Sequence, residues 1–96
     1  MITHIVLFKL LDRSQRNIEK TRNVLLSMEG KVPQLRRLEV GVDVTHSERS
    51  YDIALVTEFD SIGDLHTYQN HPFHIEVAKY INSVKESSVA VDYESG

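Results

Sequence analysis

The stretch ITHIVLFKLL, from Ile2 to Leu11, decides the fold. It is rich in apolar and β-branched residues, which is typical of a β-strand. Successive side chains of a strand point to opposite faces, and Val6 and Phe8 make one face of this strand apolar. Ile5 and Leu7 do the same for the other face. A strand that is apolar on both faces belongs in the middle of a sheet that is covered on both sides.

The rest of the chain alternates between helical and strand patterns. Apolar residues at helical spacing predict a helix from Asp12 to Gly30, where Asp12 or Ser14 can cap the start and Gly30 can end it. The later elements are expected to be strands over 35–44 and 51–59, a helix that begins near 61, breaks at 70–72 and resumes to about 85, and a strand over 88–94.

The order βαββαβ predicts a ferredoxin-like α+β fold for residues 1–96, read as a single domain. Right-handed crossovers place both helices on one face of a four-stranded antiparallel sheet, with spatial strand order 4-1-3-2. The strand over 51–59 is also apolar on both faces, so the uncovered side of the sheet would be an apolar patch of several hundred Å². A second copy packed against that side would bury it, and we therefore expect a homodimer.

Composition excludes several classes of function. The net charge of -3 argues against a protein that neutralises nucleic-acid phosphates. The absence of cysteine rules out disulfides and zinc thiolate sites, and it fits a cytoplasmic protein. The opening apolar run is too short to span a bilayer, so no membrane partner is expected. No spacing of ligands matches a recognised metal motif, no glycine-rich phosphate loop is present, and no cofactor is expected.

Five segments resemble the stress-responsive dimeric α/β-barrel (Dabb) family. They are MITHIVLFKL at 1–10, LEVG at 38–41, YDIALVTEF at 51–59, YQNHPFH at 68–74 and VAVDYE at 89–94. The resemblance covers nearly the whole chain, and Tyr-x-x-His-Pro-x-His is its most specific piece. It implies a homodimer whose two sheets close into a barrel, with a cavity between sheet and helices in each protomer. It implies no single activity, and some plant members are stress-induced proteins.

One relative with known chemistry is olivetolic acid cyclase, a plant enzyme that closes a polyketide chain by aldol condensation. The resemblance carries its catalytic tyrosine and histidine onto Tyr68 and His74, and a histidine of its first strand onto His4. A further pocket histidine has no counterpart, because Ile53 stands at that position. The pocket of this chain therefore differs from that of the cyclase.

Tyr68 and His74 are separated by the break at Pro72, and a kink there can turn both side chains toward one cavity. A neutral imidazole can take a proton from carbon beside a carbonyl, and a phenol can hydrogen-bond the developing enolate. The alternative is structural: Tyr68 packs in the core and His74 packs or caps the helix start. The remaining residues expected to line the pocket are His4, His71, Phe73 and Ile53, with His71 also a candidate helix cap.

Two functions remain open from the sequence. The first is a homodimeric stress-responsive protein that binds a small, partly apolar molecule and has no assigned activity. The second is a cofactor-independent cyclase, lyase or isomerase with His74 as general base and Tyr68 as hydrogen-bond donor to the enolate. A monooxygenase on a related dimeric barrel is a weaker third alternative, because no specific motif near Tyr68 supports it.

Overall fold

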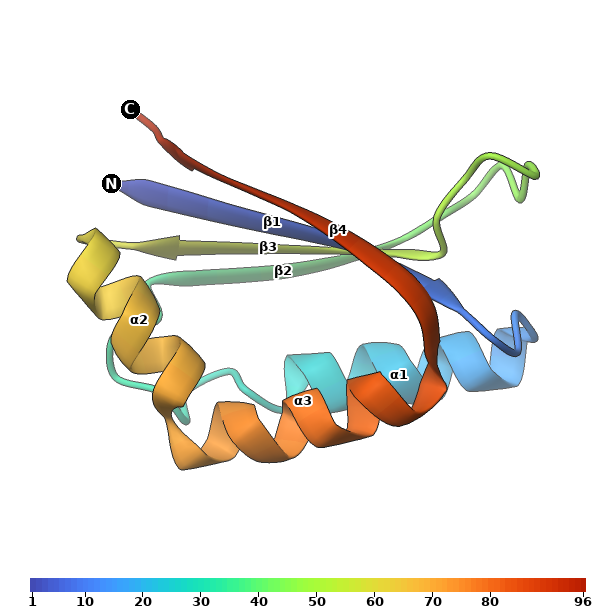
Figure 1. Ribbon diagram of the computed structural model, residues 1–96, viewed down its shortest axis with the longest axis horizontal. Coiled ribbons are helices and arrows are strands. Elements are labelled where there is room, and N and C mark those ends of the chain that lie inside the picture. Colours follow the sequence, from blue (N-terminus) through green and yellow to red (C-terminus); the bar gives the residue numbers. More distant parts are fainter.

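Three helices cover one face of a four-stranded antiparallel sheet in the computed structural model, which describes residues 1–96 (Figure 1). The elements confirm the predicted βαββαβ order, with the second helical segment divided in two. They are β1 (Ile2–Leu10), α1 (Gln15–Leu26), β2 (Arg37–Val42), β3 (Ile53–Phe59), α2 (Ile62–Asn70), α3 (Pro72–Val84) and β4 (Lys85–Glu94).

The strands lie in the order β2-β3-β1-β4, which confirms the predicted arrangement with β1 and β3 at the centre. All neighbouring strands run antiparallel, and β1 pairs with β4 from Ile2↔Glu94 to Leu10↔Lys85. β4 follows α3 without a loop, so it begins at Lys85 rather than at the expected residue 88. The two strands with apolar residues on both faces are therefore the two that have a neighbour on each side.

Each helix begins at a residue whose side chain caps it, and each of these residues was a candidate cap in the sequence. The Ser14 hydroxyl accepts the Asn17 N–H at 3.3 Å, and the Ser61 hydroxyl accepts the Asp64 N–H at 3.1 Å. His71 caps α3. The prediction was wrong about the end of α1, which stops at Leu26 rather than Gly30. Residues 27–30 form turns, and Gly30 adopts a positive φ of 75° that favours glycine.

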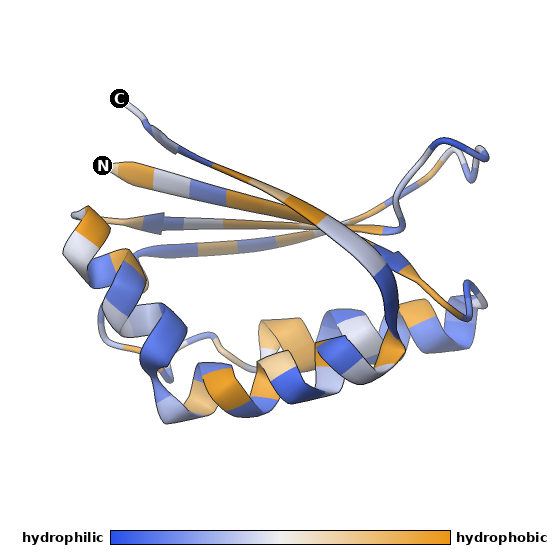
Figure 2. Cartoon of the chain, viewed as in Figure 1, coloured by the Kyte–Doolittle hydropathy of each residue, from blue (hydrophilic) through white to orange (hydrophobic).

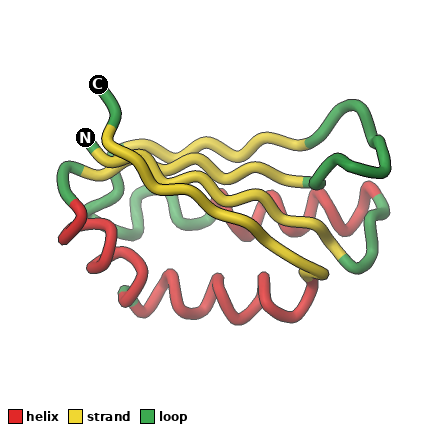
Figure 3. Tube along the Cα trace, turned by 45° about the horizontal axis from the view of Figure 1, so that its top comes forward, coloured by secondary structure: helices red, strands yellow, loops and turns green.

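The two faces of the sheet meet different surroundings. All three helices lie on the same side, as the turned view also shows (Figure 3), and α1 and α3 carry apolar segments among polar ones (Figure 2). Apolar residues of both helices belong to the hydrophobic core. The covered face carries β1 residues such as Phe8 and β3 residues such as Leu55 and Phe59, all buried. The opposite face is open, and the register places Val89, Val91 and Tyr93 there. No helix of the protein is long and apolar enough to cross a membrane.

Candidate functional site

A cavity of about 210 Å³ lies between the covered face of the sheet and the helices. Its walls are mainly apolar, with Val6, Phe8, Leu25, Met28, Leu55, Val77, Ala78 and Ile81. Its polar lining is short, with His4, Tyr68, Gln69, His74, Asn82 and Lys85. An apolar chamber with a few convergent polar groups is the usual form of a small-molecule site.

The break between α2 and α3 brings Tyr68 and His74 together. Tyr68 lies near the end of α2 and His74 in the first turn of α3, and their ring centroids are 4.5 Å apart at an interplanar angle of 59°. His71 between them takes an extended backbone, as the residue before a proline favours. The kink therefore turns both rings toward the cavity, where a continuous helix would separate them in direction.

Tyr68 is completely buried, and its hydroxyl donates to Met28 Sδ at 3.6 Å. A thioether is a weak acceptor, so this bond can be exchanged for a better acceptor on a ligand. Burial raises the pKa of Tyr68 well above the ordinary tyrosine value. The phenol therefore stays protonated at neutral pH and acts as a hydrogen-bond donor rather than as a base.

His74 is partly buried, and its Nδ1 is enclosed with no hydrogen-bond partner. Burial lowers the pKa of His74, the neighbouring rings of His4 and His71 lower it slightly further, and the backbone carbonyl of Gln69 opposes the shift. That carbonyl makes no well-aligned hydrogen bond with the ring, so burial prevails. The imidazole is therefore neutral at pH 7, the state that a general base requires.

Asp92, which holds the cavity residue His4, was missed from the sequence. His4 Nδ1 donates to Asp92 Oδ1, and the two residues are directly opposed in the β1–β4 ladder. This contact holds the His4 ring in a fixed orientation against β4. The alternation Val89, Val91, Tyr93 on the open face would have put Asp92 on the covered face. Only the strand register reveals that it meets His4.

Three residues that we expected to line the pocket lie outside it: His71, Phe73 and Ile53. His71 Nδ1 accepts the Phe73 N–H at 3.1 Å, so its ring is held at the start of α3 as a cap. Phe73 packs against the core instead of facing the cavity. Ile53 is buried between the partners Phe8 and Val42, four residues along β3 from Thr57, which is the partner of His4.

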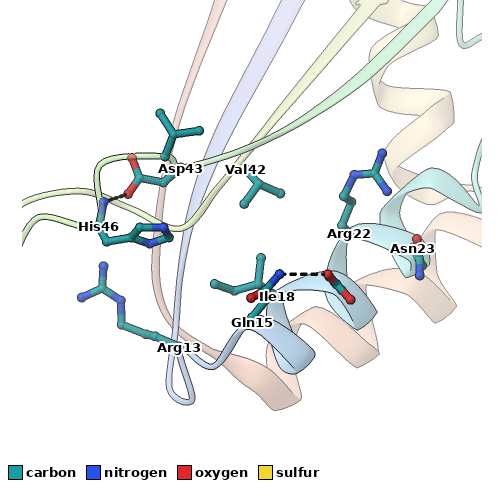
Figure 4. A pocket seen from close by; sticks show the side chains of 10 residues that line it. Arg13, Gln15, Ile18, Arg22, Asn23, Val42, Asp43 and His46 are labelled. Carbon is teal, nitrogen blue, oxygen red and sulfur yellow. Dashed lines mark hydrogen bonds between the residues drawn. The ribbon is translucent and has the colours of Figure 1, made fainter.

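A larger groove of about 690 Å³ lies between the start of α1 and the chain that follows β2 (Figure 4). Some of its polar side chains already have partners within the protein. Arg13 pairs with Asp52 at 2.8 Å. Asp43 accepts the His46 N–H at 2.7 Å, a bond that lowers the pKa of Asp43. The cavity beneath the helices is the better candidate site, because a buried tyrosine hydroxyl and an unpartnered buried histidine nitrogen converge there.

Fold and site together define a ferredoxin-like α+β domain with a cavity that gathers one tyrosine and two histidines. The family described as "Stress responsive A/B Barrel Domain", or Dabb, matches residues 2–95. The chain belongs to this family. No curated protein matches the sequence.

Several solved structures share the fold. A dimeric protein of unknown function from Bacteroides fragilis NCTC 9343 is 33% identical, with a TM-score of 0.84 over 98% of this chain and 95% of that one. A dimeric ferredoxin-like protein of unknown function from Thermobifida fusca YX is 27% identical, with a TM-score of 0.86 over 98% and 90%. The hydroxynitrile lyase of Passiflora edulis is 20% identical, with a TM-score of 0.85 over 99% and 93%, a likeness of fold alone.

Proposed function

We propose that this Dabb protein is a single-domain homodimer in which each protomer binds a small, partly apolar molecule in the cavity beneath its helices. The observation that carries the proposal is the convergence of Tyr68 and His74 on that cavity, with His4 also in its lining. A core that needed only to be filled would not keep a chamber of about 210 Å³ beside an unpartnered imidazole nitrogen.

Dimerisation is supported by the open face of the sheet. Val89, Val91 and Tyr93 are each about half exposed there, and Ile5 and Leu7 lie beside them in the central strand. A contiguous apolar surface of this kind is typical of an interface rather than of a monomer's exterior. The relatives from Bacteroides fragilis and Thermobifida fusca are both described as dimeric, which agrees with the proposal.

A second candidate function is a cofactor-independent cyclase, lyase or isomerase. In this mechanism a ring nitrogen of His74 takes a proton from the carbon beside a carbonyl, and the electron pair moves to the carbonyl oxygen. The Tyr68 hydroxyl then donates a hydrogen bond to that oxygen as it becomes an enolate. The lowered pKa of His74 and the raised pKa of Tyr68 favour these two roles over the reverse assignment.

Two likenesses bear on this second candidate. The segment from Tyr68 to His74 resembles the part of olivetolic acid cyclase that carries its catalytic tyrosine and histidine. The hydroxynitrile lyase of Passiflora edulis shares the fold, so the same scaffold is that of a lyase in one distant relative. Ile53, which stands where the cyclase has a further pocket histidine, argues that the substrate is a different one.

Ligand binding and catalysis can be tested with one small ketone. Acetophenone is titrated into the labelled protein, and the Tyr68 and His74 ring resonances are followed by NMR. Exchange of the methyl protons of acetophenone for deuterium is measured in the same samples. Binding shifts both rings, and general-base catalysis adds exchange that His74→Ala lowers by roughly 10²- to 10⁴-fold. Tyr68→Phe costs less, because it removes one hydrogen bond and keeps the packing.

His66→Ala is the matched control, because His66 is an exposed histidine of α2 outside the cavity. His66→Ala should leave the ligand-induced shifts of both rings and the rate of deuterium exchange unchanged. Binding without exchange supports the ligand-binding function alone. Exchange that survives in His74→Ala contradicts the catalytic assignment, and the absence of any ring shift contradicts the cavity as the binding site for this ketone.

A further inference from the structure

We propose that Lys85 makes the cavity selective for anions, so that its ligand is a small molecule with a carboxylate or comparable negative group at one end and a carbonyl or hydroxyl oxygen at the other. This inference rests on the proposed function, because it specifies the class of molecule that the same cavity takes.

The two ends of the cavity differ in charge. His74 lies in the first turn of α3 and Lys85 follows its last residue, so the two are separated by about 16 Å along the helix. The histidine end is neutral, since His74 is held uncharged by burial. Of the 14 residues that line the cavity, Lys85 is the only lysine or arginine, and none is an aspartate or glutamate.

The Lys85 ammonium is held on the cavity side of the sheet. Its Nζ donates to the Ser88 hydroxyl at 3.3 Å, and Ser88 is the β4 partner of Phe8, whose side chain lines the cavity. Strand partners present their side chains to the same face, so this hydrogen bond keeps the amine at the covered face beside Phe8.

Lys85 lacks a counter-ion. It is partly buried, yet it takes part in none of the ion pairs of the protein, whose lysine and arginine members are Arg13, Arg36, Arg37 and Lys79. One hydroxyl leaves the ammonium with unfilled donor capacity. A partly buried charge without a partner is costly, and an anionic ligand would relieve that cost. The cation also lies at the end of α3, where it complements the helix dipole, and this structural role must be separated by experiment.

The test uses two probes of nearly the same shape, para-acetylbenzoate and para-acetylbenzamide. Both carry a ketone for the histidine end, and only the first carries a charge. Their dissociation constants are measured by calorimetry in low-salt buffer at pH 7.5. A charge-assisted hydrogen bond is stronger than a neutral one, so the benzoate should bind the wild-type protein about tenfold more tightly, which corresponds to about 1.4 kcal/mol.

Lys85→Met keeps the length of the side chain and removes its charge. The preference for the benzoate should therefore disappear, so that both probes bind with about equal affinity, while the affinity for the benzamide is retained. Lys85→Arg should keep the preference. Lys79→Met is the matched control, because Lys79 is an exposed lysine of α3 that pairs with Glu76 and does not line the cavity. It removes the same charge and should leave the preference at about tenfold.

The outcomes separate the two proposals. Equal binding of both probes by the wild-type protein overturns the anion selectivity and leaves the ligand-binding cavity in place. A Lys85→Met variant that unfolds at lower temperature but keeps the tenfold preference also overturns it, and assigns Lys85 to the helix end alone. Binding of neither probe overturns the selectivity together with the proposed site for aryl ketones.

Discussion

The two faces of this sheet are both apolar, but only the covered face contains buried groups that could act on a ligand. On the covered face, His4 and the helix residues Tyr68 and His74 stand among the apolar side chains around a cavity. On the open face, Val89, Val91 and Tyr93 are exposed, and no helix covers them (Figure 1). Apolar residues on a face of the sheet therefore indicate only that other elements or a second copy pack there. The few polar side chains among them indicate the candidate site.

The buried polar groups of the protein are themselves of two kinds. Asp52 is buried but well satisfied, since it accepts the Leu10 N–H and the Arg13 Nε–H at 2.8 Å each. His74 Nδ1 is enclosed and accepts nothing. A satisfied buried group stabilises the fold, whereas an unsatisfied one costs free energy and needs another reason to be there.

Removing packing from the covered face should have the largest effect on stability. Phe59 is completely buried and its ring lies 4.9 Å from that of Tyr68. Phe59→Ala should lower the free energy of unfolding by about 3–5 kcal/mol, measured by urea denaturation at fixed protein concentration. Tyr93→Ala on the open face is the comparison, and its cost should depend on protein concentration because it acts on the interface. A loss below 1 kcal/mol for Phe59→Ala would contradict the assignment of the core.

The next largest effect should come from a charge on the open face. Val91→Asp places a carboxylate in the proposed interface, where an unpaired buried charge costs several kcal/mol, so the dimer should dissociate more than about 100-fold more readily. Sedimentation velocity over a range of concentrations measures this. Val42→Asp makes the same change at the sheet edge, but the register of Val42 with Ile53 points it to the covered face, and it should leave the dimer intact. Equal weakening by both variants would argue against the open face as the interface.

Local patterns in the sequence were sufficient for most of the fold. Two-sided apolar strands put β1 and β3 at the centre, and Ser14, Ser61 and His71 each cap the helix for which they were candidates. These features depend on neighbours in the chain. The predicted end of α1 lies too late in the sequence. The residues after Leu26 are compatible with a longer helix, but in the structure they form turns.

The candidate site was only partly predictable. The proline break was enough to suggest that Tyr68 and His74 approach each other. Asp92 could not be identified as the partner of His4 from the sequence. The two residues are 88 positions apart, and their contact depends on the register of β1 with β4. Which residues line a cavity depends on three-dimensional packing in the same way, and for that reason Ile53 and Phe73 were wrongly expected there.

The smallest effect concerns pH and His74. Its pKa is lowered in the folded protein, so below about pH 6.5 the unfolded chain binds a proton that the folded protein does not. The free energy of unfolding should therefore fall as the pH drops through that range, until the folded-state pKa is reached. His74→Gln should show a shallower fall between pH 7.5 and 5 in urea titrations, and His66→Gln should match the wild-type slope. A steeper fall in His74→Gln would contradict the buried neutral imidazole.

The most direct test of the difference between the two faces is the mass of the wild-type protein in solution. If a second copy covers the open face, sedimentation equilibrium at micromolar concentration should give twice the chain mass of 11.0 kDa. A stable interface of that kind buries more than about 1,200 Å² in total. A single species at 11.0 kDa would contradict the account, because the apolar open face would then stand in water without a partner.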